Sequence, residues 1–351
     1  MGGIEMKKFI FFLITVTVLC SCGDFLLNED YRGGDWFYLE NKGATMPVWV
    51  NGNKQSKTFI IFLHGGPGDT AMIMPLFDAL IELQKDYAIV YYDQRSSGVA
   101  QGNAKPDSFK VEQMVEDLEK LVVLIQHKYN NPAIFLMGIS WGGTLGTAFL
   151  VNPINQTHIS GWIEIDGGHN LRDGMAHSAE WVITMATEQI NQGNNTGHWN
   201  KEIAWYNTKP DLFDFKKVER HAGNVEKLNG YAYNPSNSIM SLLPMPTLIF
   251  SSPYNLFFES NKKSLTSVMW RRLENINFVP EMHKITIPSL ILWGRHDGIL
   301  PVVQAFEAYD NIGSVNKYIH IFEKSAHNPI IEEPELFVQK VKEFINKYKG
   351  M

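Results

Sequence analysis

The chain has 351 residues, of which 44% are hydrophobic, 12% aromatic and 19% charged. This hydrophobic fraction is enough for a folded core and excludes disorder as the main state, because disorder requires low hydrophobicity and high net charge. The formal net charge of -6 argues against a nucleic-acid-binding protein, which would present a basic face. Two cysteines are too few for a disulfide-rich scaffold or a four-cysteine zinc site.

The start of the chain has the pattern of a signal peptide. Lys7 and Lys8 precede an uncharged apolar run over residues 9–19, which is short for a permanent membrane-spanning helix. The run leads into Leu19-Cys20-Ser21-Cys22-Gly23, which resembles the lipobox of bacterial lipoproteins. The resemblance implies cleavage before Cys22 and acylation of Cys22. It therefore implies a lipid-anchored protein of the bacterial cell envelope that faces away from the cytoplasm.

We accordingly expect residues 1–21 to be a lipoprotein signal peptide and residues 22–34 a tether. The alternatives are an ordinary secretory signal cut nearby and a single N-terminal anchor. Both cysteines lie at this cleavage point, so the mature chain would keep only Cys22 and form no internal disulfide.

Strand-like and helix-like patterns alternate over the rest of the chain. Apolar runs and alternating patterns predict strands at 35–40, 46–50, 58–63, 87–92, 133–138, 159–166, 289–293 and 317–322. Helical spacing of apolar residues predicts helices at 71–84, 108–129, 141–150 and 334–347. This alternation indicates an α/β fold with a mostly parallel central sheet and helices on both faces.

One long interval interrupts the alternation. Residues 168–284 contain polar stretches and an apolar run broken by prolines, and they have no repeat of fixed period. We expect a mostly helical insertion that forms a lid over one edge of the sheet. The body of the fold would then consist of residues 35–167 and 285–351.

A serine nucleophile is predicted at residue 140. Gly138-Ile139-Ser140-Trp141-Gly142 matches the G-x-S-x-G nucleophile elbow, with a predicted strand before it and a predicted helix after it. The sharp turn between strand and helix would project the Ser140 hydroxyl. Small residues at 138 and 142 are required because the turn brings the two elements close together.

A serine needs a base that removes its proton, and the order expected for this elbow is serine, acid, histidine. Asp297 follows the predicted strand at 289–293, and His327 follows the predicted strand at 317–322. Both lie on loops after sheet strands, where they would converge with Ser140. The nearest rivals are His296 as the base and Asp310 as the acid.

The developing oxyanion requires donors that already point at it. His64-Gly65-Gly66-Pro67-Gly68 directly follows the strand at 58–63, where such elbows take one backbone amide. We expect the amide of Gly66, or alternatively that of Gly65, to act together with the amide of Trp141. This chemistry requires no metal and no organic cofactor.

Three motifs together resemble the proline iminopeptidase (prolyl aminopeptidase) branch of the α/β-hydrolases: His64-Gly65-Gly66-Pro67-Gly68, Asp93-Gln94-Arg95-Ser96-Ser97-Gly98 and Gly138-Ile139-Ser140-Trp141-Gly142-Gly143. The resemblance implies an α/β-hydrolase fold with a helical lid. It also implies a serine peptidase that releases the N-terminal residue, often proline, from peptides. His64, Asp93 and Arg95 are then expected to support the site structurally.

The chain departs from this family in its lid. The family's peptidases bind the free amino group through lid glutamates, one of them in a Trp-Glu dipeptide, and this chain contains no Trp-Glu. Glu259 is a candidate for another such glutamate, or a surface carboxylate.

The lid instead carries a set of large apolar residues, which suits an acyl pocket, contact with the bilayer, or plain lid core: Leu242, Leu243, Met245, Leu248, Ile249, Phe250, Leu256, Phe257 and Phe258. The alternative function is therefore a carboxylic-ester hydrolase with an apolar lid pocket. A more remote alternative is a non-catalytic binding lipoprotein on the same fold. The expected partners are a peptide or ester substrate and, through Cys22, a membrane.

Overall fold

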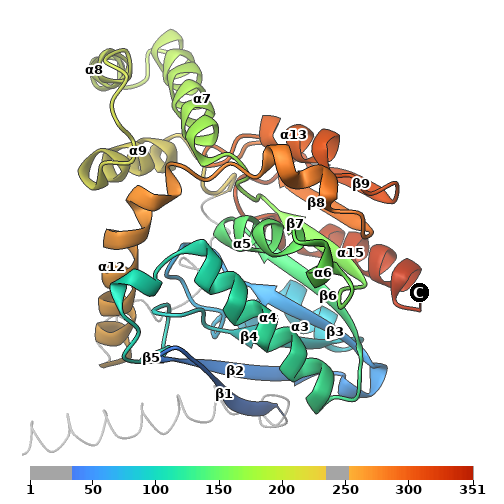
Figure 1. Ribbon diagram of the computed structural model, residues 1–351. Coiled ribbons are helices and arrows are strands. Elements are labelled where there is room, and N and C mark those ends of the chain that lie inside the picture. Colours follow the sequence, from blue (N-terminus) through green and yellow to red (C-terminus); the bar gives the residue numbers. More distant parts are fainter. Residues whose placement is uncertain (1–33, 235–252, 351) are drawn as a thin grey trace, which may run out of the picture.

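The computed structural model describes residues 34–234 and 253–350, which form a nine-stranded sheet with helices on both of its faces (Figure 1). Eight strands follow the order β1-β2-β4-β3-β6-β7-β8-β9, and β5 pairs with β2 beside them. The strands are β1 (Asp35–Asn41), β2 (Ala44–Gly52), β3 (Thr58–Leu63), β4 (Ala88–Tyr92), β5 (Gln101–Gly102), β6 (Ala133–Ile139), β7 (Gly161–Ile165), β8 (Ser289–Gly294) and β9 (Lys317–Phe322). The pairs from β4 through β9 are parallel, whereas β1 and β2 are antiparallel. This arrangement confirms the predicted α/β fold with a mostly parallel sheet.

Consecutive residues of each central strand contribute to opposite cores, because side chains alternate between the two faces of a strand. In β3, Phe59 and Ile61 belong to one core cluster, while Ile60 and Phe62 belong to the other. All four side chains are fully buried. An uninterrupted apolar run is therefore what a strand covered on both faces requires.

Helices cover both faces of the sheet. The core on one face includes residues of α4 (Val111–Lys128), α5 (Trp141–Leu150) and α13 (Val303–Asn311). The core on the other face includes residues of α3 (Asp78–Gln84) and α15 (Pro334–Tyr348). Short helical turns complete the body: η1 (Lys54–Ser56), η2 (Met74–Leu76), η3 (Pro106–Ser108), α6 (Pro153–Gln156) and α14 (Pro329–Glu332).

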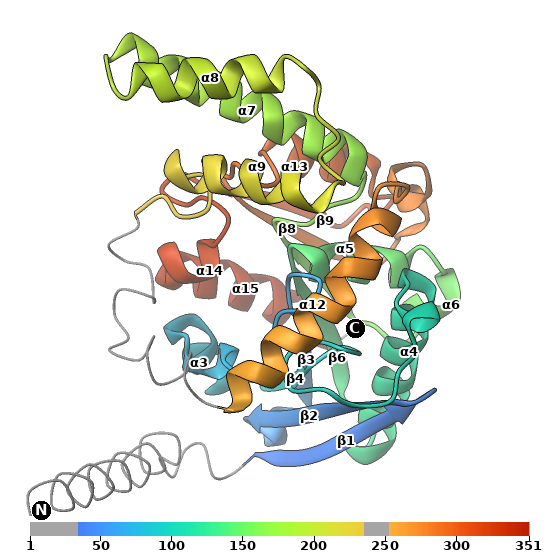
Figure 2. The same ribbon diagram turned by 90° about the vertical axis from the view of Figure 1, so that its left-hand side faces the viewer.

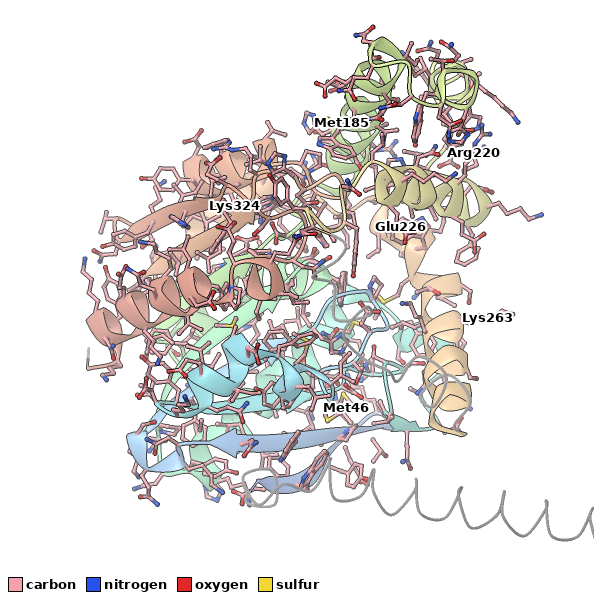
Figure 3. The ribbon with its side chains drawn as sticks, turned by 180° about the vertical axis from the view of Figure 1, so that it is seen from behind. Met46, Met185, Arg220, Glu226, Lys263 and Lys324 are labelled. Atoms are coloured by element: carbon pink, nitrogen blue, oxygen red, sulfur yellow. The ribbon has the colours of Figure 1, made fainter. Side chains whose placement is uncertain are left out.

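The insertion between β7 and β8, which we call the lid, is mostly helical where it is described. Its elements are α7 (Leu171–Asn191), α8 (Thr196–Tyr206), α9 (Phe215–Lys227), α12 (Pro253–Leu273) and η5 (Val279–Lys284). α7, α8 and α9 extend beyond the sheet and share a small core of their own (Figure 1). Met185 on α7 and Arg220 on α9 mark this part of the lid in the view from behind (Figure 3).

α12 returns from the lid across the body, in front of the central strands (Figure 2). Leu265, Met269 and Leu273 are buried in the same core as α4 and α5. The side-chain amide of Asn261 donates to the carbonyls of Gly98 and Ala100, at 3.0 and 2.9 Å. α12 is thus attached to the loop that follows β4, at the carboxyl edge of the parallel strands.

Two predicted helices are shorter than the sequence pattern indicated. The region predicted as helix 71–84 contains the 3-10 turn η2 followed by α3, because Pro75 cannot lie inside an α-helix. The region predicted as helix 108–129 begins as α4 only at Val111, after the separate turn η3. In both places a proline-bearing 3-10 turn precedes the regular helix.

Several predicted features lie outside the described residues. These are the signal peptide, nearly all of the tether, Cys22, and the part of the apolar lid run over residues 242–250. Among residues 34–234 and 253–350, no helix combines the length and the apolar character needed to cross a membrane.

A buried ion pair joins the loop after β4 to the body. The guanidinium of Arg95 makes two hydrogen bonds of 2.6 Å with the carboxylate of Asp117 on α4, and both residues are almost completely buried. Asp117 also accepts a 2.7 Å hydrogen bond from the side-chain amide of Asn41, at the end of β1. Such a bidentate pair fixes the loop geometrically, since a guanidinium and a carboxylate match in only a few orientations.

Candidate active site

Ser140 lies on the sharp turn between β6 and α5, in a backbone conformation that residues other than glycine seldom adopt. Its φ is 54° and its ψ is -118°. The Ser140 amide donates to the carbonyl of Ile165 on β7, at 2.9 Å. The side chain is partly exposed, whereas the helix that follows is buried throughout. The turn therefore presents one hydroxyl at the carboxyl edge of the sheet.

The two glycines of the elbow have no room for a side chain. A methyl group on Gly142 would lie 2.0 Å from the carbonyl oxygen of Leu63, and one on Gly138 would lie 2.4 Å from that of Gly142. Real Cβ contacts are never this short, so the turn requires glycine at both positions.

The structure brings the predicted acid and base together. His327 Nδ1 and Asp297 Oδ2 lie 2.7 Å apart, and both side chains are buried. Asp297 Oδ1 accepts hydrogen bonds from the backbone amides of Ile299 and Leu300, at 2.8 and 2.9 Å. These donors fix the orientation of the Asp297 carboxylate. His327 Nε2 forms no hydrogen bond with the described residues and is available to a hydroxyl.

Ser140, Asp297 and His327 share one edge of the sheet. Ser140 follows β6, Asp297 follows β8 and His327 follows β9, and these parallel strands lie in the order β6-β7-β8-β9. Carboxyl ends of parallel strands meet at the same edge, which is where active sites form in open α/β sheets.

The two rivals lie elsewhere. His296 Nε2 is 3.2 Å from the carbonyl of Glu323, and its ring lies against Tyr233, with centroids 4.6 Å apart. Asp310 is exposed on α13.

Two backbone amides near Ser140 lack acceptors among the described residues. They belong to Gly66, in the turn after β3, and to Trp141, the first residue of α5. A methyl group on Gly65 would lie 3.5 Å from Ser140 Cβ, so the turn adjoins the predicted nucleophile. Unpaired amides beside a nucleophile are the arrangement that stabilises an oxyanion. The Gly65 amide is likewise unpaired, so the alternative to Gly66 stays open.

Gln94 connects the oxyanion turn to the elbow. Its side chain accepts from Trp141 Nε1 at 2.8 Å and donates to the carbonyl of His64 at 3.2 Å. Its backbone amide donates to His64 Nε2 at 3.1 Å. His64 Nδ1 therefore carries the ring proton and donates to the carbonyl of Gly65, at 2.8 Å. The sequence analysis identified His64 as a supporting residue of the site but assigned no role to Gln94. Both residues follow predicted strands in the quoted motifs.

Asp93 holds the neighbouring loops. Its buried carboxylate accepts hydrogen bonds from the Thr70 hydroxyl and from the amides of Ala71 and Val99, at 2.7–2.8 Å. Burial raises the pKa of Asp93, and these donors act in the opposite direction. Its position agrees with the structural role that the resemblance implied.

A second carboxylate lies next to the predicted acid, and sequence reasoning missed it. Asp166 follows β7, is completely buried and adopts a φ of 46°. Its Oδ1 accepts from the Gly294 amide at 2.9 Å, whereas Oδ2 has no partner among the described residues. Burial, followed by the charge of Asp297, raises the pKa of Asp166 well above its ordinary value. The Asp166 carboxyl group therefore binds a proton more readily than an ordinary aspartate does.

Asp166, Asp297 and His327 are the one group of acidic and histidine side chains in the described ranges close enough to share a metal, with ligand atoms within 4.8 Å of one another. Asp297 already uses its oxygens on two amides and on His327 Nδ1, and Asp166 uses Oδ1 on an amide. These contacts match an acid–base pair better than a set of metal ligands.

A lid segment of residues 230–234 lies along the loops that carry the acid and the base. The Gly298 amide, directly after Asp297, donates to the carbonyl of Gly230 at 2.9 Å. The Asn328 side chain, directly after His327, donates to the carbonyl of Tyr231 at 3.1 Å. The lid therefore contacts both loops.

A series of hydrogen-bonded side chains inside the lid ends at Gly298, on the loop of the acid. The hydroxyl of Tyr206 and Nδ1 of His221 are 2.8 Å apart, as are Nε2 of His221 and the hydroxyl of Ser178. Ser178 in turn donates to the carbonyl of Gly298. Burial lowers the pKa of His221 to about 4, so the ring is neutral and bonds in both directions.

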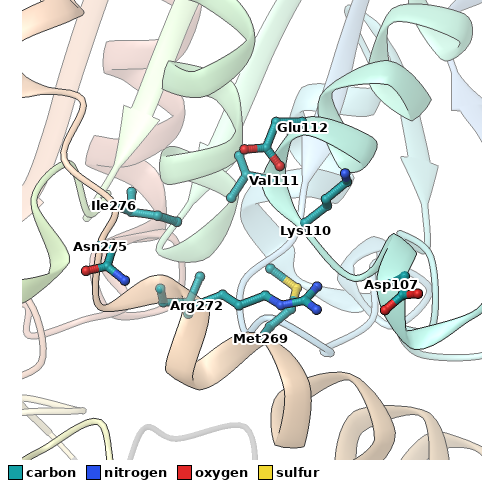
Figure 4. A pocket seen from close by; sticks show the side chains of 9 residues that line it. Asp107, Lys110, Val111, Glu112, Met269, Arg272, Asn275 and Ile276 are labelled. Carbon is teal, nitrogen blue, oxygen red and sulfur yellow. The ribbon is translucent and has the colours of Figure 1, made fainter.

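Glu259 is part of α12, but its side chain is not among those described. A surface cavity of about 450 Å³ lies between α12 and the start of α4, where Lys110, Glu112 and Arg272 line it (Figure 4). None of the predicted site residues lines that cavity.

Comparison with known proteins agrees with this geometry. A family model described as the alpha/beta hydrolase fold matches residues 58–334. A proline iminopeptidase of Heyndrickxia coagulans is 25% identical over 290 residues, covering 82% of this chain and 91% of that protein. A probable aminopeptidase of Bacillus subtilis, YbaC, is 24% identical over 313 residues, covering 83% of this chain and 89% of that protein. The crystal structure of a proline iminopeptidase of Mycobacterium smegmatis superimposes with a TM-score of 0.65 at 15% identity, covering 90% of this chain and 99% of that one.

The raised pKa of Asp166 predicts a pH-dependent cost to stability. The folded pKa is raised above the ordinary 3.8, so unfolding releases a proton and the free energy of unfolding falls as the pH rises above about 4. Asp166→Asn removes this slope. Urea unfolding between pH 5 and 8 should therefore show the parent losing stability relative to the variant as the pH rises. Parallel curves would contradict the inference.

The control for this comparison is Asp107→Asn, which neutralises an exposed aspartate on η3. Its stability curve should run parallel to that of the parent. The pKa of Asp166 is also raised by the charges of Asp297, Glu332 and Glu164. These residues are unchanged in the parent and in both variants.

Proposed function

The chain belongs to the α/β-hydrolase family and is a serine hydrolase, and from this premise we propose that it is an aminopeptidase that releases N-terminal residues from peptides. The observation that carries the proposal is the 2.7 Å contact between His327 and Asp297 at the edge where Ser140 projects. The matches to two proteins named proline iminopeptidase span 91% and 96% of the length of those proteins. They favour peptides with a free N-terminus as the substrate class.

In the proposed mechanism, His327 Nε2 takes the proton of the Ser140 hydroxyl as the oxygen attacks the scissile carbonyl. The amides of Gly66 and Trp141 donate to the oxyanion of the tetrahedral intermediate. His327 then protonates the leaving amine, and an acyl-enzyme remains on Ser140. Water activated by His327 releases the N-terminal residue, while Asp297 orients the imidazole and stabilises its positive charge throughout.

Asp166 fits this mechanism as a neighbour of the acid that takes up a proton readily. A second ionised carboxylate beside Asp297 would be repelled by it, and this repulsion contributes to the raised pKa of Asp166. Only Asp297 contacts His327.

We also propose that the enzyme is anchored to a membrane through acylated Cys22. The proposal rests on the lipobox-like sequence at residues 19–23. Several acyl chains would hold the protein firmly, since each buried methylene contributes about 0.8 kcal/mol.

Ser140→Ala should reduce kcat by about three to six orders of magnitude, because the variant cannot form the acyl-enzyme. The matched control is Ser267→Ala, which changes an exposed serine on α12 and should keep the parent's activity. A fluorophosphonate probe should label the parent and the control but not Ser140→Ala. A folded parent that is not labelled would favour a non-catalytic binding protein.

Substrate comparison separates a peptidase from an ester hydrolase. We expect proline p-nitroanilide to be hydrolysed at least tenfold more efficiently, by kcat/KM, than its N-acetylated form, because the free amine is recognised. Equal rates, together with faster hydrolysis of longer acyl p-nitrophenyl esters, would instead support an esterase whose apolar lid binds the acyl chain.

Cys22→Ser should move the protein from the membrane fraction to the soluble fraction of bacterial cells that express the full chain. The reason is that serine offers no thiol for acylation. Ser21→Ala keeps a small residue before the cysteine, and this control should remain in the membrane fraction. A Cys22→Ser variant that stays in the membrane fraction would contradict the lipid anchor.

A further inference from the structure

Asp69 follows the oxyanion turn, and its carboxylate lies close to Ser140. A methyl group on Gly65 would lie 3.5 Å both from Asp69 Oδ2 and from Ser140 Cβ. These two atoms are therefore at most twice that distance apart. The side chain of Asp69 is 42% exposed, so it is open to a molecule that enters the site.

Lys262 of α12 holds one oxygen of this carboxylate. Its Nζ lies 2.8 Å from Asp69 Oδ1. The adjacent Asn261 fixes α12 through its two hydrogen bonds to the loop after β4. Lys263, in contrast, is exposed on the outer side of the helix (Figure 3). Lys262 thus orients the Asp69 carboxylate.

The second oxygen of Asp69 faces the site without a donor. None of the described residues donates a hydrogen bond to Oδ2, and this oxygen is the one near Gly65. An ionised carboxylate offers about four acceptor positions, so the contact with Lys262 leaves the others for a ligand. The ion pair is partly exposed and worth little by itself, because water screens it.

Tyr231 and His327 lie near the same opening. Their ring centroids are 6.0 Å apart. Tyr231 is 50% exposed, so its ring is accessible to a molecule beside His327. Burial and the nearby charges of Asp69 and Asp297 raise the pKa of Tyr231, so its hydroxyl stays neutral. Asp69 and Tyr231 thus both border the space above the predicted triad.

The chemistry of an aminoacyl substrate fits this position. In any α-amino acid the nitrogen lies about 2.5 Å from the carbonyl carbon, since two bonds separate them. When that carbon is held about 3 Å from Ser140 Oγ, the ammonium nitrogen lies within roughly 6 Å of Oγ. A carboxylate that binds the ammonium must therefore lie near the nucleophile, as Asp69 does.

We propose that Asp69 Oδ2 binds the free α-ammonium group of the substrate, with Lys262 holding Asp69 in place. This inference rests on the proposed aminopeptidase function and assigns its specificity to the oxyanion turn. The sequence analysis considered Glu259 of the lid as a carboxylate that binds the amine. It did not consider Asp69. Blocking the amine removes the charge and places bulk against Asp69, so N-acylated peptides are rejected.

The test compares the parent with Asp69→Asn on two amides of the same shape. One is proline p-nitroanilide, and the other is cyclopentanecarboxylic acid p-nitroanilide, which lacks the amine. Asp69→Asn should lower kcat/KM for the proline substrate by about ten- to hundredfold, the value of one hydrogen bond between charged groups. The amine-free substrate should change by less than about threefold, because it makes no such bond.

Asp107→Asn is the matched control and should behave as the parent on both substrates. Labelling by a fluorophosphonate probe verifies that Asp69→Asn keeps a working nucleophile. Equal losses on both substrates would overturn the proposal, because they would mean that Asp69 only supports the turn. Loss of the proline preference in Glu259→Gln but not in Asp69→Asn would also overturn it.

A different outcome would contradict the proposed aminopeptidase function itself. A parent that hydrolyses both amides equally well would not be an aminopeptidase that requires a free amine, whatever its variants do. A parent that prefers the proline substrate, and an Asp69→Asn variant that keeps this preference in full, would contradict only the role of Asp69.

Discussion

The tight approach of two backbones at the Ser140 turn is the constraint on which the rest of the site depends. Gly142 contacts the end of β3, and Gly138 contacts Gly142, without space for a Cβ atom. This contact brings the turn after β3 against the start of α5. The unpaired amides of Gly66 and Trp141 therefore come to lie near one hydroxyl. Any side chain at the two glycines would separate the nucleophile from its oxyanion donors.

The carboxyl edge of the sheet concentrates acidic side chains around one histidine. Asp297 accepts hydrogen bonds from two amides and contacts His327, whereas Asp166 has a single amide and one oxygen without a donor among the described residues. Burial and the charge of Asp297 raise the pKa of Asp166. The two neighbouring carboxyl groups therefore have different surroundings, and only Asp297 supports the histidine.

The lid is coupled to the reacting groups at several points. Segment 230–234 bonds to the loops of the acid and the base, and the chain from Tyr206 ends at Gly298. α12 bonds to the loop after β4 and, through Lys262, to Asp69. The position of the lid and the geometry of the site therefore depend on the same contacts. The same hydrogen bonds thus hold the lid and the loops of the site together.

Local patterns in the sequence were enough to predict every strand except the two-residue β5, together with the elbow at Ser140 and the loops of Asp297 and His327. A buried strand is an apolar run, and the elbow is one short motif, so neither requires knowledge of distant residues. Where a local signal was misread, as for the helix predicted at 71–84, Pro75 interrupts the pattern.

Only the tertiary structure revealed Asp166 beside Asp297, Tyr231 near His327, and the pair of Asp69 with Lys262. Asp69 and Lys262 are 193 residues apart, and they meet because α12 crosses back over the sheet edge. The periodicity of apolar residues cannot predict such a contact, since the contact depends on strand order and on the path by which an insertion returns to the sheet. The sequence by itself determined which reactive side chains the chain offers, and the tertiary structure decided which of them lie side by side.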